Sequence, residues 1–145
     1  MKLRGTEIIK ASKGTLLQGD ISGEVRCFSI DSRAIKKGDF FIPLKGEHTD
    51  GHNYISAACK QGAIGSFTER DLGKSLDLPD HFMLIRVNNS LQALQKLAGA
   101  YRKKFKLEVV GVTGSSGKTT TKDFIAGVLS AKYKVLKTTG NLNNE

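Results

Sequence analysis

The chain carries the stretch Gly111-Val-Thr-Gly-Ser-Ser-Gly-Lys118-Thr-Thr-Thr-Lys122 directly after the apolar run Leu107-Glu-Val-Val110. Small residues let the backbone turn until several N–H groups converge on one point, which faces the positive end of the following helix. A polyphosphate fits such a point. The order of strand, glycine-rich loop, Gly-Lys-Thr and helix therefore predicts a nucleoside triphosphate-binding loop and not a solvated turn.

The residues of this loop have distinct expected roles. Lys118 is the candidate catalytic residue because its charge would lie beside the β- and γ-phosphates, and the Thr119 hydroxyl is the candidate ligand of Mg²⁺. One position departs from the usual motif, since Val112 stands where a glycine is expected six residues before the lysine, and this indicates a variant family. We expect ATP to contact Gly114, Ser115, Ser116, Gly117, Lys118, Thr119 and Thr120.

Composition is that of a globular protein. Hydrophobic residues make up 39% of the 145-residue chain and there are only two prolines, so a packed core is expected. No apolar stretch is long enough to span a membrane, and the N-terminus lacks the apolar segment of a signal peptide, so we expect a cytoplasmic protein without membrane contact. Two cysteines make no disulfide framework, and Cys27 is expected to act as a small hydrophobe in a strand.

The formal charge of +9 raises nucleic-acid binding as an alternative function. The basic residues are scattered, however, and the run Arg102-Lys103-Lys104 falls in the last turn of a predicted helix, where cations interact favourably with the helix dipole. No aromatic stacking platform lies beside a basic groove in the sequence. We therefore expect no nucleic-acid partner, and the charge suits anionic small molecules such as nucleotides.

Alternating apolar runs and amphipathic segments predict an α/β protein of two units. Helices are expected over 54–62, over 90–104 with Ser90 as the N-cap, and after the phosphate loop, where an apolar face contains Phe124, Ile125, Val128 and Leu129. Strands are expected over 25–30, 39–44, 63–67, 82–87, 107–110 and 134–137. Residues 1–105 can form a small domain. Residues 106–145 supply only the first βαβ part of a larger phosphate-loop domain, so the chain is expected to be truncated.

Several motifs in order resemble the ATP-dependent Mur ligases, which build the peptide stem of bacterial peptidoglycan. The loop Thr113-Gly-Ser-Ser-Gly-Lys-Thr-Thr120 is similar to the shifted phosphate loop of that family. Three segments of the N-terminal half are similar to the uridine-nucleotide substrate domain of that family. They are Ile30-Asp-Ser-Arg33, Lys37-Gly-Asp-Phe-Phe-Ile-Pro-Leu44 and Lys45-Gly-Glu-His-Thr-Asp-Gly-His52. The resemblance covers the whole chain.

The resemblance implies an ATP-dependent ligase that forms an amide bond through an acyl phosphate, with ATP and Mg²⁺ as cofactors. The Ser-Ser loop and the ending Thr139-Gly-Asn-Leu-Asn-Asn-Glu145 imply addition of D-alanyl-D-alanine to UDP-N-acetylmuramoyl-tripeptide. The resemblance also implies a monomeric full-length enzyme, of which this fragment alone would be inactive. Positions implied to contact substrate are Ile30, Ser32, Glu47, His48, Thr49, Asn141 and Asn144.

Four alternatives stay open at this point. The family member that adds the third stem residue shares the Asp-Ser-Arg and Asp-Gly-His motifs. A nucleotide-dependent switch with a partner-binding N-terminal domain would have the same phosphate loop but no affinity for uridine nucleotides. His48, His52, Asp50 and Cys59 could be metal ligands, although no helix aligns the imidazoles. The segment 31–33 could be an ordinary turn with a structural salt bridge.

Overall fold

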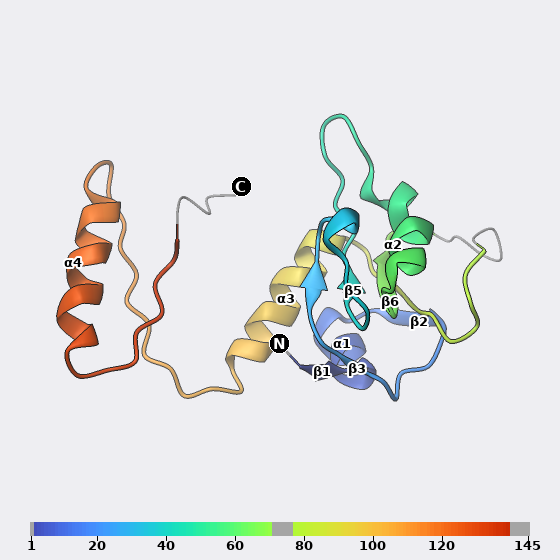
Figure 1. The fold of residues 1–145 in the computed structure, drawn as a ribbon, viewed down its shortest axis with the longest axis horizontal. Helices are drawn as coiled ribbons and strands as arrows, with labels where there is room; N and C mark the ends of the chain where they lie inside the picture. Colours follow the sequence, from blue (N-terminus) through green and yellow to red (C-terminus); the bar gives the residue numbers. More distant parts are fainter. Residues whose placement is uncertain (1, 71–76, 140–145) are drawn as a thin grey trace. The chain divides into compact units, whose positions relative to one another are not determined.

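A computed structural model describes residues 2–70 and 77–139, and it divides into two compact units, Met1–Lys106 and Leu107–Glu145 (Figure 1). The first unit contains the strands β1 (Leu3–Arg4), β2 (Thr15–Gln18), β3 (Glu24–Val25), β4 (Phe28–Ser29), β5 (Phe40–Phe41), β6 (Gly65–Thr68) and β7 (Met83–Arg86). Its helices are α1 (Gly5–Ser12), the 3-10 turns η1 (Ser32–Ala34) and η2 (Gly51–Tyr54), α2 (Ile55–Gln61) and α3 (Ser90–Arg102). The second unit contains α4 (Lys118–Ser130).

Five strands of the first unit form a mixed sheet in the order β2-β7-β6-β5-β4. Strands β4 to β7 run parallel, whereas β2 is antiparallel to β7. Strands β1 and β3 form a separate antiparallel pair. Because the carboxyl ends of β4 to β7 lie at one edge of the sheet, the loops after them meet at that edge, where ligands of such sheets usually bind.

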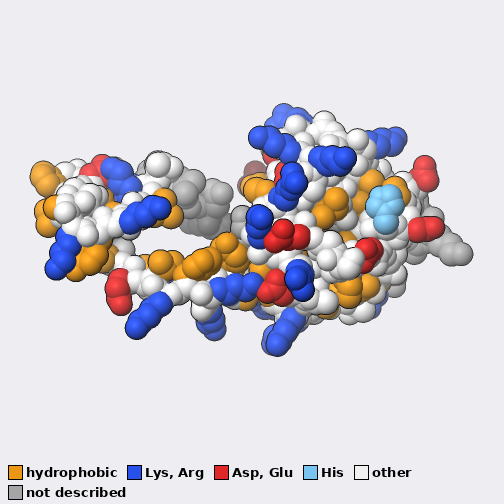
Figure 2. All heavy atoms as spheres, turned by 60° about the horizontal axis from the view of Figure 1, so that its bottom comes forward, with side chains coloured by type: hydrophobic (Ala, Val, Ile, Leu, Met, Phe, Trp, Pro, Cys, Tyr) orange, Lys and Arg blue, Asp and Glu red, His pale blue; other side chains and the backbone are white. Residues whose placement is uncertain are grey.

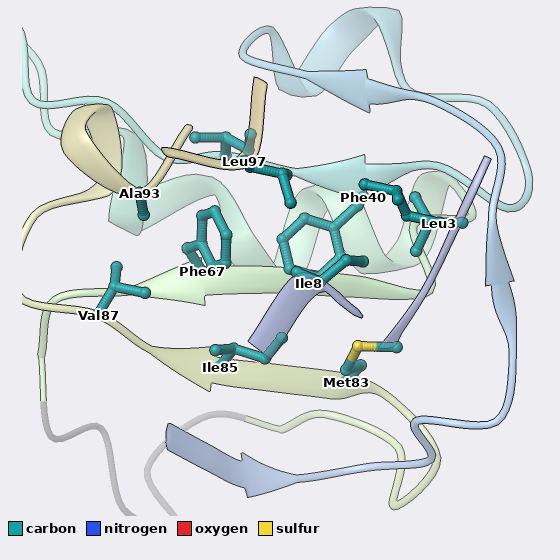
Figure 3. Packing of buried hydrophobic residues seen from close by; sticks show 11 residues of the cluster. Leu3, Ile8, Phe40, Phe67, Met83, Ile85, Val87, Ala93 and Leu97 are labelled. Atoms are coloured by element: carbon teal, nitrogen blue, oxygen red, sulfur yellow. The ribbon is translucent and has the colours of Figure 1, made fainter. Parts of the chain in front are cut away.

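The sheet is covered on both faces, and successive side chains of a strand point to opposite faces. Phe40 and Ile42 belong to a cluster with α1 and α3, and Phe41 between them belongs to a second cluster with α2. Figure 3 shows the first cluster, in which Ile8 of α1 and Leu97 of α3 lie over the sheet residues. Because both faces of the sheet are covered, a central strand can be apolar at every position and not only at alternate ones.

The two predicted helices of the first unit are present. Gly62, the last residue of the range predicted for the first helix, is the C-cap of α2, since it has a φ of +111° and donates its N–H to the carbonyl oxygens of Ala58 and Cys59. The predicted N-cap of α3 is wrong by one residue. Asn89 is the cap, and its side chain accepts a hydrogen bond from Gln92 N–H at 2.8 Å, whereas Ser90 is already helical.

The predicted strand over 25–30 is two strands in different sheets. Strand β3 pairs with β1 and β4 pairs with β5, and the chain leaves one sheet for the other at Arg26 and Cys27. Cys27 is exposed, so its expected role as a small hydrophobe in a strand is wrong. Within the predicted strand over 39–44, β5 covers only Phe40–Phe41. The flanking residues still bond to adjacent segments of the sheet, since Ile42 N–H donates to Ser29 O and Asp39 O accepts from Ile64 N–H, and the side chain of Ile42 is buried.

The second unit lacks the two strands predicted over 107–110 and 134–137. Both stretches are without strand pairing in its described residues, 107–139. Two side chains of the predicted apolar face of α4 are uncovered there, since Phe124 is 72% exposed and Val128 75%, whereas Ile125 and Leu129 are half-buried. A parallel strand needs neighbours on both sides, and none is present within 107–139. No helix among the described residues of either unit has the length and apolar character to cross a bilayer.

Candidate functional site

The phosphate loop adopts the backbone shape that its glycines predict. Gly114 has a φ of +152° and Gly117 has a φ of +74°, both in the region that strains any residue with a side chain. Gly117 is the N-cap of α4, and its carbonyl accepts the first helical hydrogen bond from Thr121 N–H at 2.9 Å. The N–H groups of the first helical turn therefore face out of the helix without an intrahelical partner, as an anion site requires.

Lys118 lies at the start of α4 and folds back over the loop. Its Nζ donates a hydrogen bond to the carbonyl oxygen of Gly114, four residues earlier. The ammonium group is thus held over the segment whose N–H groups would contact phosphate. Ser115, Ser116, Thr119 and Thr120 are exposed around it, so the seven predicted nucleotide contacts form one continuous surface within the second unit.

An open groove of about 510 Å³ follows one side of α4 and begins at the phosphate loop. Its lining is formed by Thr119, Thr120, Asp123, Phe124, Gly127 and Val128. Asp123 accepts a hydrogen bond from Lys137 Nζ at 2.9 Å, which lowers the pKa of this carboxyl. The groove therefore has hydroxyl groups and a carboxylate at its loop end, with apolar side chains beyond them.

In the first unit, Ile30 and Ser32 follow the carboxyl end of β4 in a tightly bonded turn. Asp31 N–H donates to Ser29 Oγ at 3.2 Å, and the Asp31 side chain caps η1 by accepting from Arg33 N–H at 2.9 Å. The Arg33 guanidinium pairs with both carboxylate oxygens of Asp31 at 3.0 Å, which lowers the pKa of Asp31. The structure therefore gives Asp31 and Arg33 a structural ion pair. Ile30, 54% exposed, and half-buried Ser32 lie on either side of Asp31.

Glu47, His48 and Thr49 follow the carboxyl end of the neighbouring strand, β5, at the tip of a hairpin that we call the 44–51 hairpin. Two backbone hydrogen bonds close it, from Gly51 N–H to Leu44 O and from Gly46 N–H to Thr49 O, both at 2.9 Å. A Cβ on Gly51 would lie 2.7 Å from Leu44 backbone atoms, so only glycine allows this approach. All three tip side chains are exposed.

Sequence reasoning missed a polar network behind this hairpin. Asp50 Oδ1 contacts His52 Nδ1 at 2.6 Å, and Asp50 Oδ2 accepts from Arg70 Nη2 at 2.6 Å. His52 Nε2 accepts from Glu69 N–H at 3.0 Å, and Arg70 Nη1 donates to Asn53 Oδ1 at 3.3 Å. The spacing of Asp50 and His52 was the available signal, but their partners lie about 20 residues away after β6, and no local pattern connects them.

This network replaces the metal site considered as an alternative. Among residues 2–70 and 77–139, no cluster of three or more His, Cys, Asp or Glu side chains could hold a metal ion. His52 is buried against its protein partners, while His48 is exposed. Asn141 and Asn144 lie outside the described residues. Figure 2 shows Lys and Arg side chains spread over the visible face with acidic ones among them, not collected into one basic groove.

Comparisons with known proteins match both units. The model of the Mur ligase family, catalytic domain, matches residues 24–102, and that of the Mur ligase middle domain matches residues 112–145. UDP-N-acetylmuramoyl-tripeptide--D-alanyl-D-alanine ligase of Bacillus subtilis is 41% identical over 138 residues, which are 94% of this chain and 30% of that protein. The chain thus spans about a third or less of the length of the relatives it matches.

Two solved structures agree with the fold. MurF from Acinetobacter baumannii has a TM-score of 0.88 at 32% identity, over 99% of this chain and 31% of that one. MurF ligase from Thermotoga maritima in complex with ADP has a TM-score of 0.72 at 39% identity, over 82% of this chain and 26% of that one.

Proposed function

This chain belongs to the Mur ligase family, and we propose that it supplies two parts of a ligase that joins D-alanyl-D-alanine to UDP-N-acetylmuramoyl-tripeptide. Residues 1–105 form the UDP-sugar-binding domain, and residues 106–145 begin the ATP-binding domain. The observation that carries this proposal is the pair of candidate sites in one chain. One lies at the carboxyl edge of the β4–β5 pair and the other at the N-terminus of α4.

The second unit binds the phosphates of ATP. In the proposed reaction the γ-phosphoryl group passes to the carboxylate that ends the tripeptide, and the amine of the dipeptide displaces phosphate from the acyl phosphate to form the amide. Phosphoryl transfer depends mainly on positioning and on neutralising charge, so the protein need not supply a nucleophile. The loop N–H groups hold the phosphates, and Lys118 leaves the Gly114 carbonyl to pair with them.

Mg²⁺ fits the oxygen donors at the start of α4. Thr119 would hold it through its hydroxyl, with the remaining positions taken by phosphate oxygens and water, as this ion prefers. When bound, Mg²⁺ neutralises charge on the transferring phosphoryl group. The described residues contain no cluster that could hold such an ion by itself, which is consistent with a metal that binds together with the nucleotide.

The first unit binds the UDP-sugar at the carboxyl edge of its sheet. Ser32 and the tip residues Glu47, His48 and Thr49 supply hydrogen-bonding groups, and exposed Ile30 offers an apolar surface of the kind a nucleobase covers. Both segments are closed by local hydrogen bonds, so their side chains start close to a fixed geometry. Asn141 and Asn144 are proposed to position substrate or nucleotide.

The ligase that adds the third stem residue is the second candidate. It remains a candidate because both ligases share the segments Asp31-Ser-Arg33 and Asp50-Gly-His52, which therefore do not distinguish them. The loop pair Ser115-Ser116 and the segment Asn141-Leu-Asn-Asn144 favour the dipeptide-adding ligase. The two candidates differ in the UDP-sugar whose carboxylate is activated. The first requires UDP-N-acetylmuramoyl-tripeptide, and the second requires UDP-N-acetylmuramoyl-dipeptide.

We also propose that the complete enzyme is a cytoplasmic monomer that acts on small molecules and not on nucleic acid. The use of ATP and of a soluble nucleotide-sugar supports the location. The scattered basic side chains support the absence of a nucleic-acid partner. Amide ligation of this kind serves cell-wall synthesis and, through it, cell shape and division.

Isothermal titration of the 145-residue chain tests the proposal. UDP-N-acetylmuramoyl-tripeptide should bind saturably, and UMP and ATP serve as comparison ligands. Tighter binding of UDP-N-acetylmuramoyl-dipeptide than of UDP-N-acetylmuramoyl-tripeptide would favour the second candidate. A folded chain that binds ATP but no uridine nucleotide would overturn the assignment of the first unit and favour a nucleotide switch. Binding that falls steeply with salt and extends to any nucleic acid would indicate a basic module instead.

A further inference from the structure

We propose that His52 is a positioning residue that holds the tip of the 44–51 hairpin, residues 46–49, in the shape that binds the UDP-sugar. The identity of the ligand rests on the proposed function, but the geometry of His52 does not. Its side chain is only 2% exposed. A buried imidazole requires a partner at each polar ring atom, and His52 has one at both nitrogens.

The partners of His52 fix its tautomer. Glu69 N–H is a donor only, so Nε2, at 3.0 Å from it, must be the unprotonated nitrogen. The proton is therefore on Nδ1, which donates to Asp50 Oδ1 at 2.6 Å. The ring is held in one orientation between Asp50, the N-cap of η2, and Glu69, the residue after β6.

From His52 the contacts lead to the base of the hairpin. Asp50 Oδ1 accepts a second hydrogen bond from His52 N–H at 3.0 Å, and Oδ2 accepts from Arg70 Nη2 at 2.6 Å. Asp50 is also the residue whose backbone pairs with Lys45 across the hairpin. The side chain of Asp50 is thus fixed by His52 and Arg70, and its backbone forms one side of the base that carries the tip.

Three charged or titratable groups face this imidazole from the elements around it. Asp50 lies against Nδ1, and Arg70 neutralises the far oxygen of that carboxylate. Glu69 presents its backbone N–H to Nε2 and turns its carboxylate to Ser90 N–H. A second proton on Nε2 would point at the Glu69 N–H, donor against donor. The contact with Glu69 N–H therefore requires Nε2 to act as an acceptor.

Substitutions can separate the two contacts of His52. His52→Asn keeps a polar group near the position of Nδ1, His52→Gln keeps one near the position of Nε2, and His52→Ala removes both. His81→Ala is the matched control, because His81 is an exposed histidine in the loop before β7. Each variant of the 145-residue chain is titrated with UDP-N-acetylmuramoyl-tripeptide and with ATP, and its folding is checked by thermal melting.

We expect His52→Ala to raise the Kd for the UDP-sugar about tenfold or more, the range of one charge-assisted hydrogen bond. His52→Asn and His52→Gln should each recover part of that loss, and His81→Ala should change nothing. ATP affinity should stay constant, since the phosphate loop belongs to the other unit. A folded His52→Ala, or a folded His52→Asn if alanine prevents folding, with wild-type affinity for the UDP-sugar would overturn the proposal.

Ring ¹⁵N chemical shifts of His52 and amide exchange keep this proposal distinct from the proposed function. A wild-type chain that binds no UDP-sugar defeats the function, whereas the inference then stands or falls on the hairpin itself. Shifts typical of the Nδ1–H tautomer and faster exchange of Gly46 and Gly51 N–H in His52→Asn would support the positioning role. An Nε2–H tautomer, or unchanged exchange at both amides, would overturn it.

Discussion

Glu69 Oε1 accepts a hydrogen bond from the backbone N–H of Ser90 at 2.6 Å and so connects the end of β6 to the first residue of α3. Together with the cap from Asn89, this contact satisfies two donors at the N-terminus of α3 with side chains of the chain itself. The N-terminus of α4 differs, because glycine and not a side chain caps it. Of these two helix starts, the one at Lys118 is therefore the one open to phosphate.

Replacing Glu69 with alanine should destabilise the first unit. The change removes a charged acceptor from a helix N-terminus, which corresponds to about 1–2 kcal/mol in the free energy of unfolding. Glu24→Ala is the control, because its exposed ion pair with Lys2 at 3.7 Å contributes about 0.5 kcal/mol or less. Urea titration measures both, and equal midpoints for the two variants would contradict the assigned role.

Asn89 and Ser90 should respond in opposite ways to alanine. Asn89→Ala loses the cap and should lower the free energy of unfolding by about 1 kcal/mol. Ser90 Oγ is buried without a hydrogen-bond partner among the described residues, so Ser90→Ala removes an unsatisfied group and should leave stability unchanged or raise it. If urea titrations showed Ser90→Ala to be the more destabilising of the two substitutions, Ser90 and not Asn89 would be the cap.

Phe67 should be a large contributor to the core of the first unit. It is fully buried, and its ring packs against Phe40 with centroids 4.9 Å apart (Figure 3). Phe67→Ala should cost about 3–5 kcal/mol, whereas Phe105→Ala, at a side chain 48% exposed, should cost about 1 kcal/mol or less. Similar losses for both variants in denaturant titrations would mean that Phe67 does not lie in a close-packed core.

The sequence predicts those parts of the fold that local pattern controls. Strand β7 was evident because Met83, Leu84 and Ile85 are all apolar, and the phosphate loop because its glycines precede a lysine. Strand β2 was missed because Thr15-Leu-Leu-Gln18 is short and only partly buried, and it exists because β7 offers an edge. The division of 25–30 between two sheets and the partners of His52 depend on contacts distant in sequence, which no local pattern encodes.

Asp50 should make the first unit sensitive to acid. Its pKa lies well below the ordinary value, held there first by the hydrogen bond from His52 N–H and further by the His52 ring and Arg70. Because the folded pKa is the lower one, the carboxylate stabilises the fold fully above the unfolded pKa of about 4 and loses this effect as pH falls toward the folded value.

The comparison of wild type with Asp50→Asn tests this dependence. Wild type should be the more stable protein at pH 5, and the difference in free energy of unfolding should shrink progressively below about pH 4. Asp80→Asn, at an exposed aspartate, controls for the loss of one acidic group. A difference that stays constant between pH 5 and pH 3 would show that the Asp50 contacts do not favour its charged form.

Lys118 should control nucleotide affinity without affecting the first unit. Its ammonium is already held over the loop by the Gly114 carbonyl, so phosphate binding exchanges one partner for another with little movement of the backbone. Lys118→Met retains the length of the side chain and removes the charge, and a charge-assisted contact of about 1.5–3 kcal/mol corresponds to roughly ten- to hundredfold weaker ATP binding. Lys132→Met is the control, because Lys132 lies beyond the other end of α4, over the Tyr133 ring.

Titration with ATP and with the UDP-sugar separates the units: only ATP affinity should fall, and only in Lys118→Met. Equal ATP affinity in the two variants would remove Lys118 from the phosphate site, and a parallel loss of UDP-sugar affinity would mean that the substitution acts through folding and not through charge.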